Sequence, residues 1–170
     1  MILPETLKGF NLFVEGSGYG GRVLKFTPPK LTRKTEEFRP GGFDAAVEID
    51  VGQEKMTIEE IILAEPSVDI LRQYGRLNLD GLSIRLKGSY QAENSDLEKP
   101  LEIVMRGKWT EIDFGSFEPE KPGEMKLKGS ISYFKWTYNN STLIEIDAFN
   151  AVNIVDGQDR LAQRRANLGI

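Results

Sequence analysis

The stretch Leu82-Ser83-Ile84-Arg85-Leu86-Lys87-Gly88-Ser89-Tyr90 alternates apolar and polar side chains almost without interruption. Successive side chains of a β-strand point to opposite faces, so a period of two predicts a strand with one buried and one solvated face. Clean alternation of this kind is typical of antiparallel sheets, which often keep one face in water. The stretch therefore predicts an antiparallel β fold.

The same alternation recurs on both sides of this stretch. Upstream, Val47, Ile49 and Val51 share a face that we expect to be buried, and Glu48 and Asp50 share the opposite face. Further strands are predicted at residues 7–14, 22–28, 55–64, 101–105, 106–113, 125–138 and 144–148. The chain is therefore expected to be mainly β.

One short helix is predicted between Ser67 and Gly75. The Ser67 side chain can cap the first turn, and Gly75 stands where a helix commonly ends. Ile70, Leu71 and Tyr74 would share its buried face. No second helix is predicted with the same strength.

The length of 170 residues predicts a single domain spanning 1–170. Residues 29–43 form a long polar segment bounded by Pro and Gly, which we expect to be a loop; such connections are uncommon and often functional. The segment 117–123 is expected to be an exposed turn between strands. Residues 156–170 form a C-terminal segment, with a weak helical turn expected within 158–166.

The chain contains no cysteine and no histidine. Their absence excludes disulfides, thiolate nucleophiles, cysteine-ligated metals, Ser-His-Asp triads and any imidazole switch. Only carboxylate, Lys or Tyr chemistry would remain. We therefore expect no cofactor, no metal and no catalytic residue, and a protein that is not an enzyme.

Two motifs invite a different interpretation. Residues 16–21, Gly-Ser-Gly-Tyr-Gly-Gly, satisfy the dinucleotide pattern G-x-G-x-x-G, but a strand-like segment follows where the motif needs a helix. A turn between two strands is the better interpretation. Acidic pairs such as Glu48 with Asp50 and Glu145 with Asp147 could serve a glycosidase, although a solvated strand face has the same appearance.

Charge is distributed unevenly around a formal net charge of −4. Residues 1–43 carry seven Lys and Arg against four Glu, whereas residues 44–155 carry twelve against twenty acidic residues. The basic end and acidic middle are compatible with head-to-tail self-association, or with an ordinary solvated surface. Specific DNA binding is disfavoured because it requires a net-basic face.

The first ten residues, MILPETLKGF, lack the basic start and apolar run of a signal peptide. The longest aliphatic runs are too short to span a bilayer. We expect no signal peptide, no transmembrane segment and synthesis in a cytoplasm.

An ordered series of segments resembles the major tail tube protein of contractile-tailed bacteriophages, the myovirus type that includes prophage and R-type tailocin tubes. The resemblance runs from near Leu3 to Ile170. The matching segments are residues 7–13, 29–34, 39–42, 88–91, 104–107, 111–113, 144–147 and 159–165, together with Asn150.

The resemblance implies an antiparallel β-sandwich or partial barrel that assembles into hexameric rings with a continuous inner β-barrel. The rings would stack into the inner tube of a contractile tail, which conducts DNA or, in a tailocin, opens a pore. Expected partners are other copies of the chain, the sheath protein, a baseplate or initiator protein and the tape-measure protein. DNA would pass through the lumen without specific binding, and no small-molecule substrate is expected. The expected location is the virion tail, assembled in the host bacterial cytoplasm.

Three sets of residues follow from this interpretation. The lumen-facing candidates are Glu48, Asp50, Glu145 and Asp147, whose carboxylates would repel DNA phosphates. The candidates for a ring-stacking loop are Lys30, Arg33, Lys34, Arg39 and Phe43. The candidates for C-terminal contacts are Arg160, Arg164 and Arg165.

Two alternatives belong to other classes. A small-ligand-binding β-barrel carrier would need an interior apolar pocket and would remain monomeric. A carboxylate-based hydrolase would need clustered catalytic groups, which the sequence does not display. Rings or hollow rods in electron micrographs would distinguish the tube subunit from both.

Overall fold

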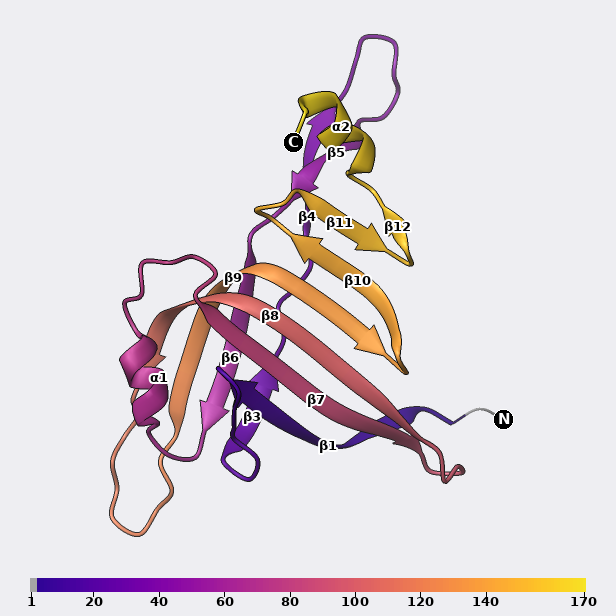
Figure 1. Ribbon diagram of the computed structural model, residues 1–170. Coiled ribbons are helices and arrows are strands. Elements are labelled where there is room, and N and C mark those ends of the chain that lie inside the picture. Colours follow the sequence, from indigo (N-terminus) through magenta and orange to yellow (C-terminus); the bar gives the residue numbers. More distant parts are fainter. Residues whose placement is uncertain (1–2) are drawn as a thin grey trace.

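The computed structural model describes residues 3–170 and shows an antiparallel β fold with two short helices (Figure 1). The strands are β1 (Glu5–Val14), β2 (Ser17–Gly18), β3 (Val23–Thr27), β4 (Arg33–Phe38), β5 (Val47–Gln53), β6 (Met56–Leu63), β7 (Leu82–Ala92), β8 (Glu98–Asp113), β9 (Met125–Tyr138), β10 (Ser141–Asp147), β11 (Val152–Val155) and β12 (Gln158–Asp159). The helices are α1 (Val68–Gln73) and α2 (Ala162–Leu168). The mainly β prediction is confirmed. The weak helical turn expected within 158–166 is a complete short helix, α2, so the described residues contain two short helices instead of one.

Ten strands form one hydrogen-bonded sheet in the order β12-β11-β10-β9-β8-β7-β1-β2, with β6 and β3 attached through β9. The branch that carries β6 and β3 turns behind β7 and β8 (Figure 1). The core therefore lies inside the bend of a single sheet. The prediction was a sandwich or a partial barrel; the described strands do not form the two stacked sheets that a sandwich requires.

The sheet forks along β9, because β9 changes its partner on one edge. Its first half pairs with β6, from Met125 to Ile131, and its second half pairs with β10, from Tyr133 onward. On the other edge β8 follows both halves, with a register shift at Gly107. A Cβ at Gly107 would lie 2.1 Å from the Ser130 carbonyl oxygen, so only glycine fits this close approach.

Buried apolar side chains from β1, β6, β7, β8 and β9 fill the bend of the sheet. Two polar contacts attach other segments to this core. The Tyr19 hydroxyl lies 2.8 Å from the Ser67 hydroxyl, and the Trp109 indole N–H donates to the Gln73 side-chain oxygen at 3.2 Å. These contacts tie the Tyr19 turn and helix α1 to the core.

Helix α1 covers one end of the core. Ser67 is its N-cap residue as predicted, but its side chain bonds Tyr19 instead of the helix amides. Ile70 is buried, whereas Tyr74 is exposed, so the predicted helix face is only partly correct. Gly75 takes a positive φ of 81° just beyond the helix, which confirms the predicted end.

Residues 29–43 differ from the predicted loop, because residues 33–38 form β4. This strand pairs with β5 from Phe38 opposite Val47 to Arg33 opposite Gln53. The two strands form a separate sheet, here called the ribbon, which projects from the body (Figure 1). The strand was missed because its sequence, RKTEEF, has almost no apolar side chains to show a period of two.

Candidate assembly interfaces

One face of the ribbon carries large apolar side chains without cover. Phe38 lies opposite Val47, and Ile49 follows two residues along on the same side. Their exposed fractions are 48%, 46% and 46%. The prediction that Val47, Ile49 and Val51 are buried is wrong for one subunit, because β4 and β5 pair only with each other. We call Phe38, Val47 and Ile49 the apolar face of the ribbon.

The opposite face of the ribbon is polar. Arg33 donates two hydrogen bonds to the Asp50 carboxylate, at 2.7 and 2.9 Å. These bonds and the Gly52 amide, which donates at 2.9 Å, hold the pKa of Asp50 below its usual range. Glu37 and Glu48 lie directly opposite each other, an arrangement of like charges that destabilises a sheet. This face therefore holds acidic charge that an external cation could balance.

The residues predicted for ring stacking all lie on the ribbon, at its base or near its tip: Lys30, Arg33, Lys34, Arg39 and Phe43. They are not equally available. Arg33 is held by Asp50, and an Arg39 amino group donates to the Asp44 carbonyl oxygen at 3.1 Å. Phe43 is exposed in the turn between the two strands.

The predicted lumen-facing carboxylates fall into two separate pairs. Glu48 and Asp50 lie on the ribbon, whereas Glu145 and Asp147 lie on β10 of the main sheet, between β9 and β11. Sequence alternation placed each pair on one face of its strand but could not relate the two strands to each other.

The β10 pair is embedded in polar contacts. The Tyr133 hydroxyl donates to Glu145 at 2.8 Å, and burial together with this hydrogen bond raises the pKa of Tyr133 to about 12. The Arg106 guanidinium lies 4.1 Å from the centre of the Tyr133 ring. Burial opposes ionisation of Asp147, but hydrogen bonds from Asn150 and a backbone amide outweigh it and lower the pKa of Asp147.

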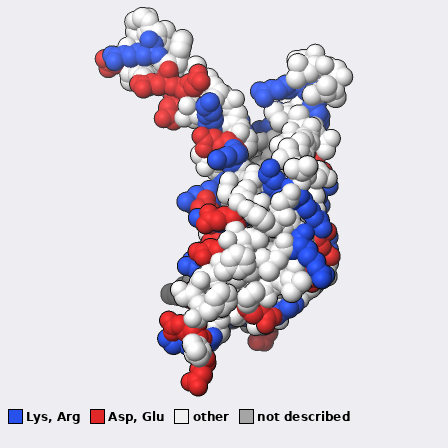
Figure 2. All heavy atoms as spheres, turned by 90° about the vertical axis from the view of Figure 1, so that its left-hand side faces the viewer, with Lys and Arg blue, Asp and Glu red and all other residues white. Residues whose placement is uncertain are grey.

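The outward face of β7, β8, β9 and β10 is net basic. Buried and solvated residues alternate along these strands. The cations on the solvated side, Arg85, Lys87, Arg106, Lys108, Lys126, Lys128 and Lys135, exceed by one the carboxylates there, which are Glu98, Glu102, Glu111, Asp113, Glu145 and Asp147. Figure 2 shows Lys and Arg running along this side of the body, at the right of the view. The acidic excess of residues 44–155 therefore lies elsewhere, on loops and on the ribbon.

The C-terminal candidates also differ in whether they are available for a contact with another subunit. Arg165 is used within the subunit, because it donates to the Ala151 carbonyl oxygen and to Asp159. Arg160 and Arg164 are exposed. Helix α2 has no buried residue, so its surface remains open for a contact. Figure 2 shows it as the lower of two projections, with the ribbon as the higher.

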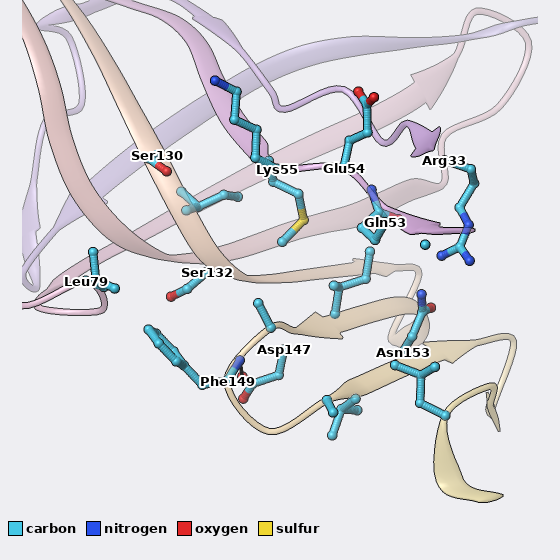
Figure 3. A pocket seen from close by; sticks show the side chains of 18 of the residues that line it. Arg33, Gln53, Glu54, Lys55, Leu79, Ser130, Ser132, Asp147, Phe149 and Asn153 are labelled. Atoms are coloured by element: carbon cyan, nitrogen blue, oxygen red, sulfur yellow. Dashed lines mark hydrogen bonds between the residues drawn. The ribbon is translucent and has the colours of Figure 1, made fainter. Parts of the chain in front are cut away.

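A cavity of about 500 Å³ opens where the sheet forks (Figure 3). Ser130 and Ser132 of β9 lie on its floor. Lys55 and the end of the ribbon form one wall, and the segment from Phe149 to Asn153 forms the other wall. We call it the fork cavity. It is lined by Arg33, Gly52, Gln53, Glu54, Lys55, Met56, Leu79, Lys108, Ser130, Ile131, Ser132, Ile146, Asp147, Ala148, Phe149, Ala151, Val152, Asn153, Leu161 and Arg164.

The described residues also bear on metal binding and membrane insertion. Among residues 3–170, no three carboxylates come together as a possible metal site. Neither α1 nor α2, the helices of the described region, has the length and apolar character needed to cross a membrane.

Comparison with known proteins gives a consistent result. The family model described as phage tail tube protein FII matches residues 4–169. The tail tube protein of Escherichia phage P2 is 35% identical over 172 aligned positions, covering 100% of both chains. The major tail tube protein of Serratia phage KSP20 is 30% identical and covers 96% of this chain and 95% of its own length.

Proposed function

Because the chain belongs to the phage tail tube protein FII family and is a non-enzymatic structural subunit of the tail tube of a contractile phage tail, we propose that it assembles into hexameric rings. These rings stack into a hollow conduit through contacts made by the ribbon. The virion tail is its location, and family membership implies assembly with other tail components.

The observation that carries the stacking proposal is the bare apolar face of the ribbon. An isolated two-stranded ribbon is marginally stable in water, and Phe38, Val47 and Ile49 leave about half of their surfaces exposed. A contact with the adjacent ring would cover this face.

Ring closure is proposed to use the open edges of the main sheet. Among the described strands, β1 pairs with β2 only at Phe13 and Val14, so its outer edge is free of ladder partners from Glu5 to Asn11. The other edge ends in the short strands β11 and β12. Edge-to-edge pairing between neighbouring subunits removes both open edges and continues the sheet around the ring as an inner barrel.

The proposed division of the chain follows from these surfaces. Residues 1–170 act as one tail-tube domain, in which residues 29–43 contribute half of the ribbon. The C-terminal segment 156–170 presents Arg160 and Arg164 to a neighbouring subunit. Partners proposed beyond the subunit itself are the sheath protein, a baseplate or initiator protein and the tape-measure protein.

Glu48, Asp50, Glu145 and Asp147 are proposed to face the lumen, where carboxylates would repel passing DNA phosphates. Asp50 is offset by Arg33, and Asp147 lies 3.9 Å from Arg106. Glu145 lies opposite Lys135, so most of the repulsion in this proposal is assigned to Glu48. Glu48→Lys should leave tube formation intact and slow DNA ejection at low salt; an unchanged ejection rate would contradict the lumen assignment.

Sedimentation velocity and negative-stain microscopy of the purified chain test the proposed assembly. Stacking predicts a transition from small species to long hollow rods above a threshold concentration. A monomer that persists at every concentration, with no rods on addition of tail-initiating components, would contradict it. The matched comparison is the double variant Val47→Ser with Ile49→Ser, which removes two of the three side chains of the apolar face.

A further inference from the structure

The loop between β8 and β9, residues 114–124, carries two exposed aromatic side chains among acidic ones. Phe117 is 76% exposed, and Phe114 is also exposed. Glu118 forms an ion pair with Lys121 within the loop, whereas Glu120 forms none with any described residue. The loop lies at the end of the body away from the ribbon and α2 (Figure 1).

The fork cavity has the complementary chemistry. Leu79 and Phe149 lie together at one end of the cavity, and apolar side chains line much of its interior (Figure 3). Lys55, Lys108 and Arg164 stand around this apolar region, and none of these three forms an ion pair with a described residue.

We infer that the fork cavity receives the β8–β9 loop of another copy of this chain, with Phe117 inserted between Leu79 and Phe149. Glu120 then faces the cations at the rim of the cavity. This inference rests on the proposed tube, and it specifies a second contact between subunits beside the ribbon.

A second copy of the chain is favoured as the occupant for two reasons. The cavity and the loop differ in charge, since the lining holds four Lys and Arg against Glu54 and Asp147, and the loop holds three Glu against Lys121. They also lie at different ends of the subunit. A contact between different surfaces of identical subunits is heterologous, and its repetition builds a filament.

The absence of cysteine allows a direct test by disulfide trapping. Ser116→Cys places a thiol beside Phe117, and Ser130→Cys places one on the cavity floor; both changes are nearly isosteric. The two variants are mixed, assembled into tubes, oxidised and separated without reductant. The inference predicts a cross-linked dimer from this pair. The matched control replaces Ser116→Cys by Ser95→Cys, in the β7–β8 turn, and should give no dimer above background.

A substitution supplies an independent readout. Burial of the exposed three quarters of Phe117 predicts that Phe117→Ser raises the critical concentration for assembly roughly 10-fold, with monomer unfolding unchanged. Glu120→Lys should also weaken assembly, and Lys55→Glu in the same chain should restore part of the loss.

The outcomes separate the two proposals. If wild-type tubes form, but Ser116→Cys and Ser130→Cys do not cross-link and Phe117→Ser assembles normally, the loop-in-cavity contact is overturned and the tube role stands. If the wild-type chain forms no tubes under any condition, both proposals fail.

Discussion

The double substitution Val47→Ser with Ile49→Ser tests whether the ribbon joins subunits. Both side chains are 46% exposed in the single subunit, so about half of each remains to be buried on assembly. Complete burial of such a side chain contributes about 1.5–3 kcal/mol, so the unburied half corresponds to roughly 0.7–1.4 kcal/mol each. Losing both costs about 1.4–2.8 kcal/mol per subunit added to the tube.

Each 1.4 kcal/mol changes an equilibrium about tenfold, so the critical concentration should rise roughly 10- to 100-fold. It can be measured by pelleting tubes and determining the protein left in solution. The free energy of unfolding of the unassembled variant should stay within about 1 kcal/mol of wild type, because an exposed surface loses little.

The matched control is Val68→Ser, which removes an exposed aliphatic side chain from α1. Its critical concentration should equal that of wild type. If the ribbon variant also assembles at the wild-type concentration while its monomer remains folded, the apolar face is not a subunit contact. The stacking proposal would then have lost its main support.

Three further predictions concern the subunit itself. Gly107→Ala should lower the free energy of unfolding, measured by urea titration, by about 1–3 kcal/mol or prevent folding, because the added Cβ would meet the Ser130 carbonyl oxygen. The control Gly9→Ala should have little effect, because a Cβ at Gly9 would meet open space. Hydrogen bonds from Lys99 and Tyr138 lower the pKa of Glu5 in the folded protein. The stability that they contribute is present above pH 4.5 and is lost as the pH falls through the folded pKa. Glu5→Gln should therefore weaken the fall of the urea unfolding midpoint at acidic pH. An ultraviolet absorbance titration should show Tyr133 ionising near pH 12. Because its folded pKa is raised, the free energy of unfolding should decline from about pH 10 towards pH 12, and Tyr133→Phe should reduce this decline.

The predicted strands of the main sheet were largely confirmed, and β9 has the predicted bounds, but the strands predicted at 101–105 and 106–113 are the single strand β8. Local periodicity is sufficient in the main sheet, because its alternating strands cover the same core; β5 alternates in the same way but lies on the ribbon. It is insufficient for β4, whose polar residues gain order only from pairing with β5. It also fails for Tyr19, which lies in a glycine-rich turn and yet is almost fully buried against Ser67.

The interfaces show a different limit of sequence reasoning. Val47 and Ile49 have the pattern of a buried face, and the pattern is correct only if a neighbouring subunit supplies the cover. Periodicity records that a face is apolar but not which molecule covers it. Phe117 shows the reverse case: the exposed turn at 117–123 was predicted and is confirmed, but a turn has no period that could indicate which surface its aromatic side chain contacts.

The most direct test of the central claim is a cryo-electron microscopy reconstruction of tubes assembled from the purified chain. The account predicts a hollow tube with six subunits per ring, in which the ribbon of each subunit lies against a subunit of the adjacent ring and Phe38, Val47 and Ile49 are covered. A filament without a central channel, or a tube whose ribbons extend into solvent with these side chains bare, would contradict it.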